Sequence, residues 1–328
     1  MKRWQLPGDP HGVAIGADGT IYVGLAQPQA VVAIDPKTGA VKQRVVLDSA
    51  EIASTKELVT MRTNHAGTRL YIANGSDESA TILSLPDLAV RREITIEGEA
   101  IRDVVPDPKG RYVYVLGRHV HVYDAEGEKE LRTISLDDPM AIAASANGGL
   151  LAIVAPEDFG NTKATSVALF DTSTFAELAR EPLQTDKTIE AALFAAGDQA
   201  LIALSRGALI EKALSVMKHE KQMTAAANGK MRMAIDFGDL TSSDTICLPE
   251  GSGAQIAALA APDVLLFAER RCDSGNAFSG SSRRVTLASL YGVAAYALAF
   301  DHVSNTVVVS DRAGFLTIYK VPRVTVVR

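Results

Sequence analysis

The sequence predicts an all-β fold, and three observations lead to this prediction. A pair of short apolar runs separated by a turn recurs seven times along the 328 residues. The runs are rich in Val, Ile, Tyr and Thr, which favour strands. Asp-Gly, Lys-Gly, Thr-Gly and Asn-Gly pairs separate or follow them, and such turns supply the positive φ angles that tight hairpins need. Four short antiparallel strands repeated seven times are typical of a seven-bladed β-propeller with mostly four-stranded blades.

The first two strands of each repeat show the period most clearly. They read HGVAIGADGTIYVGL at 11–25 and LVTMRTNHAGTRLYIANG at 58–75 in the first two repeats. Third and fourth strands follow, for example VVAIDPKTG at 31–39 and QRVVLD at 43–48. The turns between first and second strands lie 38 to 49 residues apart, except for one interval of 65 residues. These turns are marked by Gly19, Gly67, Gly110, Gly148, Gly197, Pro262 and Ser304.

We therefore expect one propeller domain over residues 1–328. A large β-sandwich, the competing architecture, does not predict seven equal repeats. Two segments compete for the last strand of blade seven: VPRVTVVR at 321–328, or KRWQLP at 2–7, which would close the ring. Blade six has room for three strands, because its third strand, expected at 283–290, runs almost directly into blade seven. The expected blades span about 8–48, 57–97, 100–136, 139–183, 188–250, 254–292 and 294–328.

Several segments resemble known propeller repeats. The run Tyr71-Ile72-Ala73-Asn74-Gly75 resembles the repeat of YVTN-type propellers, as does Tyr112-Val113-Tyr114-Val115. The first repeat, from Pro10-His11-Gly12-Val13-Ala14, is similar to NHL and streptogramin-lyase-like propellers. This resemblance covers nearly the whole chain and implies a propeller. Because such propellers include lactonases, lyases, subunits of quinoprotein amine dehydrogenases and binding proteins, it does not imply one activity.

Composition excludes several classes of protein. With 33 basic and 39 acidic residues the net charge is -6, which argues against a general nucleic-acid binder. Apolar residues make up 47%, as in soluble globular proteins, and no run approaches the roughly 20 residues of a membrane span. Cys247 and Cys272 are too few for a disulfide framework and could pair or stay free.

The first residues, MKRWQLP, carry a basic pair but no apolar stretch, so they do not read as a signal peptide. As written, the sequence predicts a cytoplasmic protein. A leader removed beforehand would make it periplasmic or secreted. The oligomeric state is left open.

Three consecutive blades contain enlarged segments, which we expect to join second and third strands on one face. These are residues 156–165, the insertion 206–230 and residues 270–284. In blade five, apolar residues from Ile210 to Met217 follow the i, i+3, i+4, i+7 spacing of a short amphipathic helix.

The enlarged segments of blades five and six are basic in an acidic chain. Residues 206–232 and 270–284 together hold ten basic and three acidic residues. The first functional hypothesis is therefore a non-enzymatic protein-binding or scaffold propeller, an accessory subunit that docks on another protein with an acidic surface. The plainer alternative is ordinary solvated charge. The expected contact residues are Arg206, Lys212, Lys218, Lys221, Arg270, Arg271, Arg283 and Arg284.

The alternative hypothesis is a lyase or lactonase-like enzyme that acts at the mouth of the central channel. The sequence contains no phosphate loop, metal motif or nucleophile elbow, so we expect no metal or other cofactor. His11 precedes the innermost strand of blade one, and with Glu190 it could abstract a proton. The residues expected at matching positions of other blades mix acid, base and amide, a poor set for a divalent cation. They are Glu57, Arg102, Glu190 and Gln255.

Two further histidines, His119 and His121, alternate along an outer strand. We expect exposure or cross-strand packing there rather than metal binding.

Overall fold

The computed structural model describes the chain in several stretches. These are residues 2–26, 29–47, 60–74, 78–159, 162–183, 189–195, 198, 200–205, 208–217, 234–240, 256–258, 264–267, 276–279, 295–301, 304, 306–311 and 313–320.

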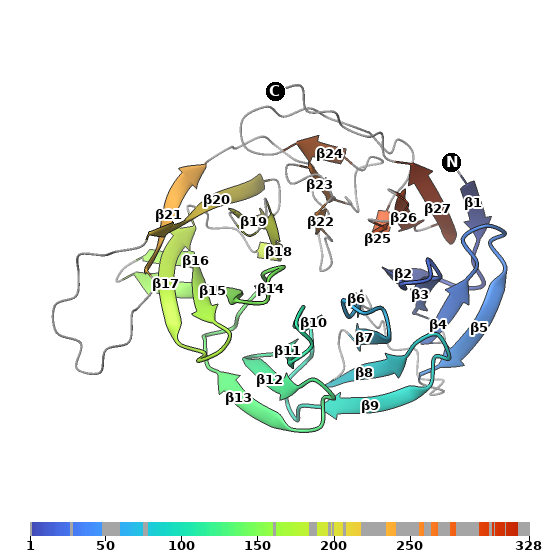
Figure 1. Cartoon of the computed structure of the whole chain (residues 1–328), viewed down its shortest axis with the longest axis horizontal. Coiled ribbons are helices and arrows are strands. Elements are labelled where there is room, and N and C mark those ends of the chain that lie inside the picture. Colours follow the sequence, from blue (N-terminus) through green and yellow to red (C-terminus); the bar gives the residue numbers. More distant parts are fainter. Residues whose placement is uncertain are drawn as a thin grey trace.

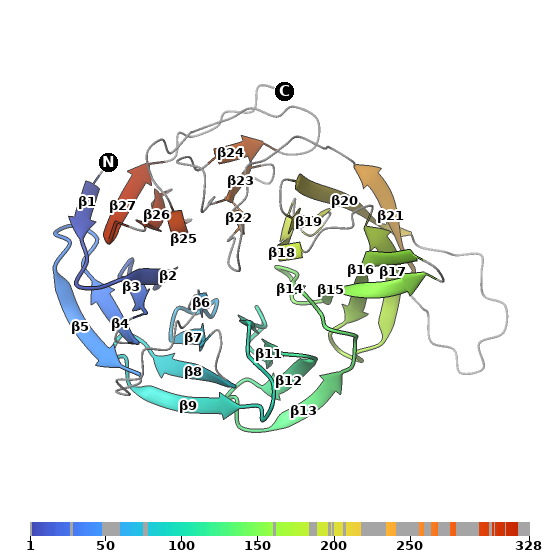
Figure 2. The same ribbon diagram turned by 180° about the vertical axis from the view of Figure 1, so that it is seen from behind.

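The described strands form antiparallel sheets that stand around a common centre, as in a propeller (Figure 1). Figure 2 shows the same ring from behind. Blade one contains β2 (Pro10–Ile15), β3 (Ile21–Leu25), β4 (Ala30–Ile34) and β5 (Val41–Val46). Blade two contains β6 (Thr60–Thr63), β7 (Arg69–Ala73), β8 (Ser79–Ser84) and β9 (Val90–Thr95). Blade three contains β10 (Asp103–Pro106), β11 (Tyr112–Leu116), β12 (Val120–Asp124) and β13 (Glu130–Ile134).

The remaining sheets complete the ring in chain order. Blade four contains β14 (Ala141–Ala144), β15 (Leu150–Phe159), β16 (Thr162–Asp171) and β17 (Glu177–Leu183). Blade five contains β18 (Ile189–Ala195), β19 (Ala200–Ser205), β20 (Ala208–Met217) and β21 (Ala234–Leu240). A three-stranded sheet follows with β22 (Ile256–Ala258), β23 (Val264–Phe267) and β24 (Asn276–Ser279). The closing sheet contains β25 (Ala295–Asp301), β26 (Thr306–Asp311), β27 (Phe315–Lys320) and β1 (Lys2–Gln5).

Tight turns join the first and second strands where the sequence places them. Gly19, Gly67, Gly110 and Gly148 all have positive φ, between 61° and 78°. L-residues rarely adopt this conformation, so glycine fits these positions. In blade three, for example, the Gly110 amide donates to the Asp107 carbonyl at 2.8 Å. The turn positions predicted for these four blades are confirmed.

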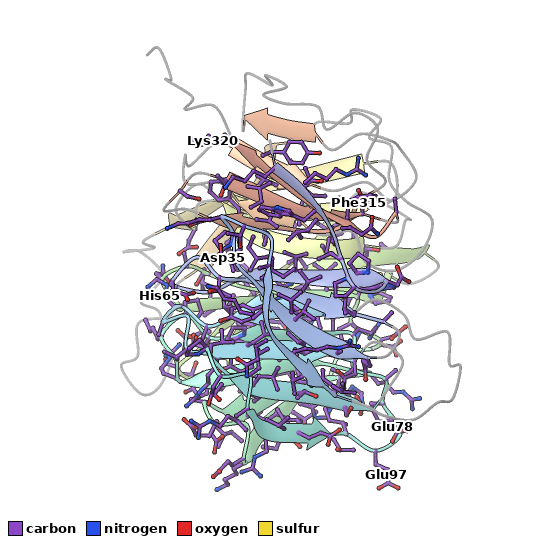
Figure 3. The ribbon with its side chains drawn as sticks, turned by 90° about the vertical axis from the view of Figure 1, so that its right-hand side faces the viewer. Asp35, His65, Glu78, Glu97, Phe315 and Lys320 are labelled. Carbon is purple, nitrogen blue, oxygen red and sulfur yellow. The ribbon has the colours of Figure 1, made fainter. Side chains whose placement is uncertain are left out.

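The strand directions give the ring two faces (Figure 3). We call "connection face" the one where second strands lead to third strands and blades lead to each other, marked by Glu78 and Glu97. We call "turn face" the opposite one, where first lead to second and third lead to fourth strands, marked by His65 and Asp35.

The core lies between neighbouring blades rather than within one sheet. Tyr114 and Leu116 of blade three pack with Ile142 and Leu151 of blade four in one buried cluster. Similar clusters join the other described neighbours from the closing sheet to blade five. Because each inner strand is covered on both faces, its apolar residues run nearly without alternation.

The N-terminal strand closes the ring. β1 pairs antiparallel with β27, from Lys2↔Ile318 to Gln5↔Phe315. Arg3 adds an ion pair to buried Asp311 at 3.1 Å, and its guanidinium lies 3.9 Å from the centre of the Phe315 ring. Of the two segments predicted to compete for this position, the one at residues 2–7 thus provides the strand beside β27. Residues 321–328 lie outside the described residues.

The helix expected in blade five is a strand where the structure describes it. β20 pairs with β19 up to Ala200↔Ala213 and with β21 from Glu211↔Leu240 to Met217↔Ala234. The prediction of a helix over 210–217 is therefore wrong. The physical reason is that partner strands on both sides take up the backbone hydrogen bonds of β20, which overrides a short apolar spacing.

The enlarged segments also differ from expectation in their placement. Residues 156–165 lie mostly in strand, because β15 and β16 pair out to Phe159↔Thr162. In blade five only residues 206–207 separate β19 from β20, so the long segment, 218–233, joins the third and fourth strands. Within 270–284, Asn276–Ser279 forms β24, whereas the third strand expected at 283–290 lies outside the described residues.

Among the described residues, no helix has the length and apolar character needed to cross a membrane.

Candidate functional site

His11 lies near the centre of the ring and faces a carboxylate. It belongs to β2, and its side chain is buried. Its Nε2 lies 3.2 Å from Oδ2 of Asp9, whose side chain is half exposed. The His11 carbonyl accepts a hydrogen bond from Ser310 Oγ of β26 at 3.3 Å. The Asp9 contact orients the imidazole, and an imidazole oriented by a carboxylate can act as a general base.

Glu190, the other residue of the expected acid–base pair, lies on a distant blade. It belongs to β18, at a register shift between Ile189 and Ala191. β2 packs beside β6 and β25, whereas β18 packs beside β14 and β22. The two strands lie on different sides of the ring centre (Figure 1). The described carboxylate beside His11 is therefore Asp9, and the Glu190 side chain lies outside the description.

Two charged residues on neighbouring inner strands pair with each other. Arg62 of β6 holds Asp103 of β10 through two bonds, Nε–Oδ1 at 3.1 Å and Nη2–Oδ2 at 2.7 Å. Burial would lower the pKa of Arg62, but Asp103 holds that pKa above its usual value. Arg102 donates to the Gly117 carbonyl and to Asp138 at 3.2 Å. The Arg62–Asp103 pair cross-links blades two and three.

Metal binding has no support in the described part of the chain. There, no three His, Cys, Asp or Glu residues are grouped so that they could hold an ion. Two of the matching inner positions, Glu57 and Gln255, lie outside the described residues, as do Cys247 and Cys272.

The longest strands lie in blades four and five and form ribbons that project beyond their sheets. β15, β16 and β20 have ten residues each, whereas the strands of blades one to three have four to six. In blade four, β14 pairs with β15 only as far as Val154, and β17 pairs with β16 only as far as Thr165. The pairs from Glu157↔Ala164 to Phe159↔Thr162 therefore extend past both neighbours on the connection face.

Blade five has the corresponding ribbon on the turn face. β19 ends its pairing at Ala200↔Ala213, and β20 and β21 continue to Met217↔Ala234. The two ribbons belong to adjacent blades, and β17 contacts β21. The two ribbons therefore lie in the same sector of the ring (Figure 1) but extend toward opposite faces.

Of the eight basic residues expected to bind a partner, seven come after strand ends in the sequence and one lies within a strand. Arg206 follows β19, and Arg270 and Arg271 come after β23; both strands end on the connection face. Lys218 and Lys221 follow β20, and Arg283 and Arg284 come after β24; these strands end on the turn face. Lys212 belongs to β20, of which the backbone is described, and the other seven lie outside the described residues.

The sequence analysis missed a buried cluster in blade three. His121 of β12 is buried between Glu99 and Glu130, with ring nitrogens 3.2 and 2.9 Å from their carboxylate oxygens. The sequence predicted exposure or cross-strand packing for His121, but it predicted neither glutamate contact. Glu99 comes from the connection before β10, 22 residues away, so no local pattern signals the contact.

No model of a protein family matches this chain, and no curated protein matches its sequence. Solved structures do match. The propeller domain of Cps50 (Swd1) from Myceliophteria thermophila has a TM-score of 0.71 at 12% identity, over 98% of this chain and 100% of that one. Hydrazine synthase of Kuenenia stuttgartiensis has a TM-score of 0.68 at 13% identity, over 97% and 96%. With the four-stranded antiparallel sheets, these similarities show that the chain has a β-propeller fold.

Proposed function

We propose that this chain is a non-enzymatic, protein-binding propeller with seven blades and YVTN-type repeats, which serves as a scaffold or accessory subunit of a larger complex. The observation that carries the proposal is the pair of ribbons projecting from blades four and five. The partner is a protein with an acidic surface, and its carboxylates meet the basic residues that follow β19, β20, β23 and β24 in the sequence, together with Lys212 of β20.

Physical chemistry supports this role for the ribbons. A two-stranded ribbon without a third strand is marginally stable in water. Its outer backbone groups can pair with another chain, which is how many domains capture an extended partner segment. In blade four, within the part of the chain that the structure describes, the ribbon from Glu157 to Ala164 has no strand on either side.

Shortening the blade-four ribbon tests the proposal. Pro156 pairs with Thr165, so an Asn-Gly turn can replace residues 157–164 and leave the four-stranded part intact. The complex would be purified from the native source through a tag on this chain and mapped by cross-linking mass spectrometry. We expect a stoichiometric partner with cross-links to blades four to six, and loss of that partner in the shortened chain. A partner retained by a shortened chain of unchanged thermal stability would contradict the role of the ribbon.

Charge reversal tests the basic residues separately. Replacing Arg270, Arg271, Arg283 and Arg284 by Glu should abolish capture of the partner. The matched control reverses four exposed charges of blades one to three, namely Arg44, Arg91, Arg118 and Lys129, and should retain capture. Equal capture by both variants would contradict the charge contribution.

The contact between His11 and Asp9 favours one alternative, a lyase or lactonase-like enzyme at the ring centre. It is tested by screening lactone and lyase substrates with the wild type and His11→Ala. Turnover that disappears in His11→Ala would replace the binding proposal. Turnover that survives His11→Ala would exclude His11 as its base.

A further inference from the structure

His121 joins two parts of blade three through both of its ring nitrogens. Nδ1 lies 2.9 Å from Oε1 of Glu130 on the outer strand β13, and Nε2 lies 3.2 Å from Oε2 of Glu99 in the β9–β10 connection. The imidazole is buried, and the Glu99 carboxylate is largely buried. The cluster therefore ties a blade-to-blade connection to the rim of the blade.

Glu99 is fixed in place by the surrounding backbone. Its Oε2 accepts hydrogen bonds from the amides of Arg118 at 2.7 Å and His119 at 3.2 Å. Burial would raise the pKa of Glu99, but the hydrogen bonds from His121 and from the two amides hold that pKa below its usual value. Gly117 makes the close approach feasible, because a Cβ there would come within 2.5 Å of Glu99 Oε2.

Glu130 is held more loosely. Its side chain is 38% exposed and accepts a hydrogen bond from Thr133 Oγ1 at 2.5 Å. It can therefore turn into water at little cost, whereas Glu99 would leave two amides unpaired.

The number of protons on the His121 imidazole determines which of its two carboxylate contacts can form. Ionised carboxylates only accept hydrogen bonds, and a neutral imidazole has a single N–H group. Both contacts therefore need the imidazolium form. After one proton leaves to solvent, a nitrogen lone pair faces a carboxylate, which is repulsive.

We propose that His121, Glu99 and Glu130 form a proton-dependent clasp: the imidazolium bridges both carboxylates, and loss of the Nδ1 proton releases Glu130 while the Nε2–H···Glu99 bond persists. Other titratable or charged groups around the ring are His119, whose ring centre lies 6.5 Å away, Tyr123 on the same strand, and Arg118, which adjoins His119. His119 Nδ1 faces the Leu136 carbonyl at 3.3 Å and so has its own partner. The clasp works independently of the proposed binding role.

Glu130→Gln is the decisive variant. The side-chain amide that it introduces can donate to the unprotonated Nδ1, so it pairs with neutral His121 and no longer favours the imidazolium. We expect residue 130 to stay hydrogen-bonded to Nδ1 at high pH in this variant, whereas wild-type Glu130 is released, as followed by nitrogen–proton NMR of the imidazole. Glu97→Gln is the matched control, because Glu97 is an exposed glutamate of the same connection, and it should behave like wild type.

The NMR tautomer gives a second readout that needs no variant. At high pH the neutral ring of wild-type His121 should carry its proton on Nε2 and none on Nδ1. Release of residue 130 from Nδ1 at high pH in both wild type and Glu130→Gln would overturn the proposal. So would an Nδ1–H tautomer of the wild-type ring at high pH.

Discussion

At the scale of single residues, Trp4 of the closing strand β1 packs tightly against Gly39 in the turn after β4. Gly39 and Gly19 have nearly equal φ angles, 76° and 78°. A Cβ on Gly39 would overlap the Trp4 ring, whereas one on Gly19 meets nothing within 4 Å. We expect Gly39→Ala to lower the free energy of unfolding by about 2–4 kcal/mol and Gly19→Ala by about 1 kcal/mol, as measured by denaturant unfolding.

A double-mutant cycle separates steric overlap from backbone strain. In a Trp4→Ala background, Gly39→Ala should cost no more than Gly19→Ala. Without the Trp4 ring, each substitution costs only the strain of a positive φ, and the two φ angles are nearly equal. The same large cost with and without Trp4 would disprove the overlap.

At the scale of elements, aspartates stabilise the turns between third and fourth strands. Oδ1 of Asp35 accepts hydrogen bonds from the amides of Lys37 at 2.7 Å and Thr38 at 3.1 Å. These bonds hold the pKa of Asp35 below its usual value of 3.8. Because the folded chain favours the ionised form, this contribution to stability is complete above about pH 5 and is lost progressively as the pH falls further.

Asp35→Asn keeps the accepting oxygen but cannot titrate. We expect the variant to lose less unfolding free energy than wild type between about pH 4 and pH 2, as followed by urea unfolding at stepped pH. Asp137→Asn, at an exposed aspartate outside the turns, is the control and should behave like wild type. A wild-type pH slope in Asp35→Asn would show that the turn bonds do not depend on charge.

The elements also show what the sequence could and could not predict. Turns such as Gly110 follow from residues next to each other, so the repeat and the described hairpins of blades one to four were predictable. The strand β20 was not, because its conformation depends on β19 and on β21, which begins 17 residues after Met217. The burial of His121 likewise depends on Glu99 from the preceding connection.

At the scale of the whole molecule, β1 determines whether the ring is closed. Without residues 1–6, the edge of β27 loses its partner strand and buried Asp311 loses Arg3. We expect this truncation to cost about 3 kcal/mol and to lower the melting temperature by about 4 °C, and the open edge to promote self-association.

Calorimetry and sedimentation velocity measure these two effects. Arg3→Ala keeps the strand and removes the ion pair, so it should destabilise less than the truncation and remain monodisperse if the wild type is. A truncated chain with wild-type melting temperature and sedimentation would contradict the role of β1.

Closure by the first strand also fixes when folding can finish during synthesis. Arg3 and Asp311 are separated by 308 residues, so β1 leaves the ribosome long before its partner exists. Blades one to five each consist of strands that follow one another along the chain and can form as they emerge. The closing sheet cannot, and the nascent ring stays open until translation has passed Lys320. Every newly made molecule thus passes through a stage in which all other blades can be complete while β1 has not yet paired with β27.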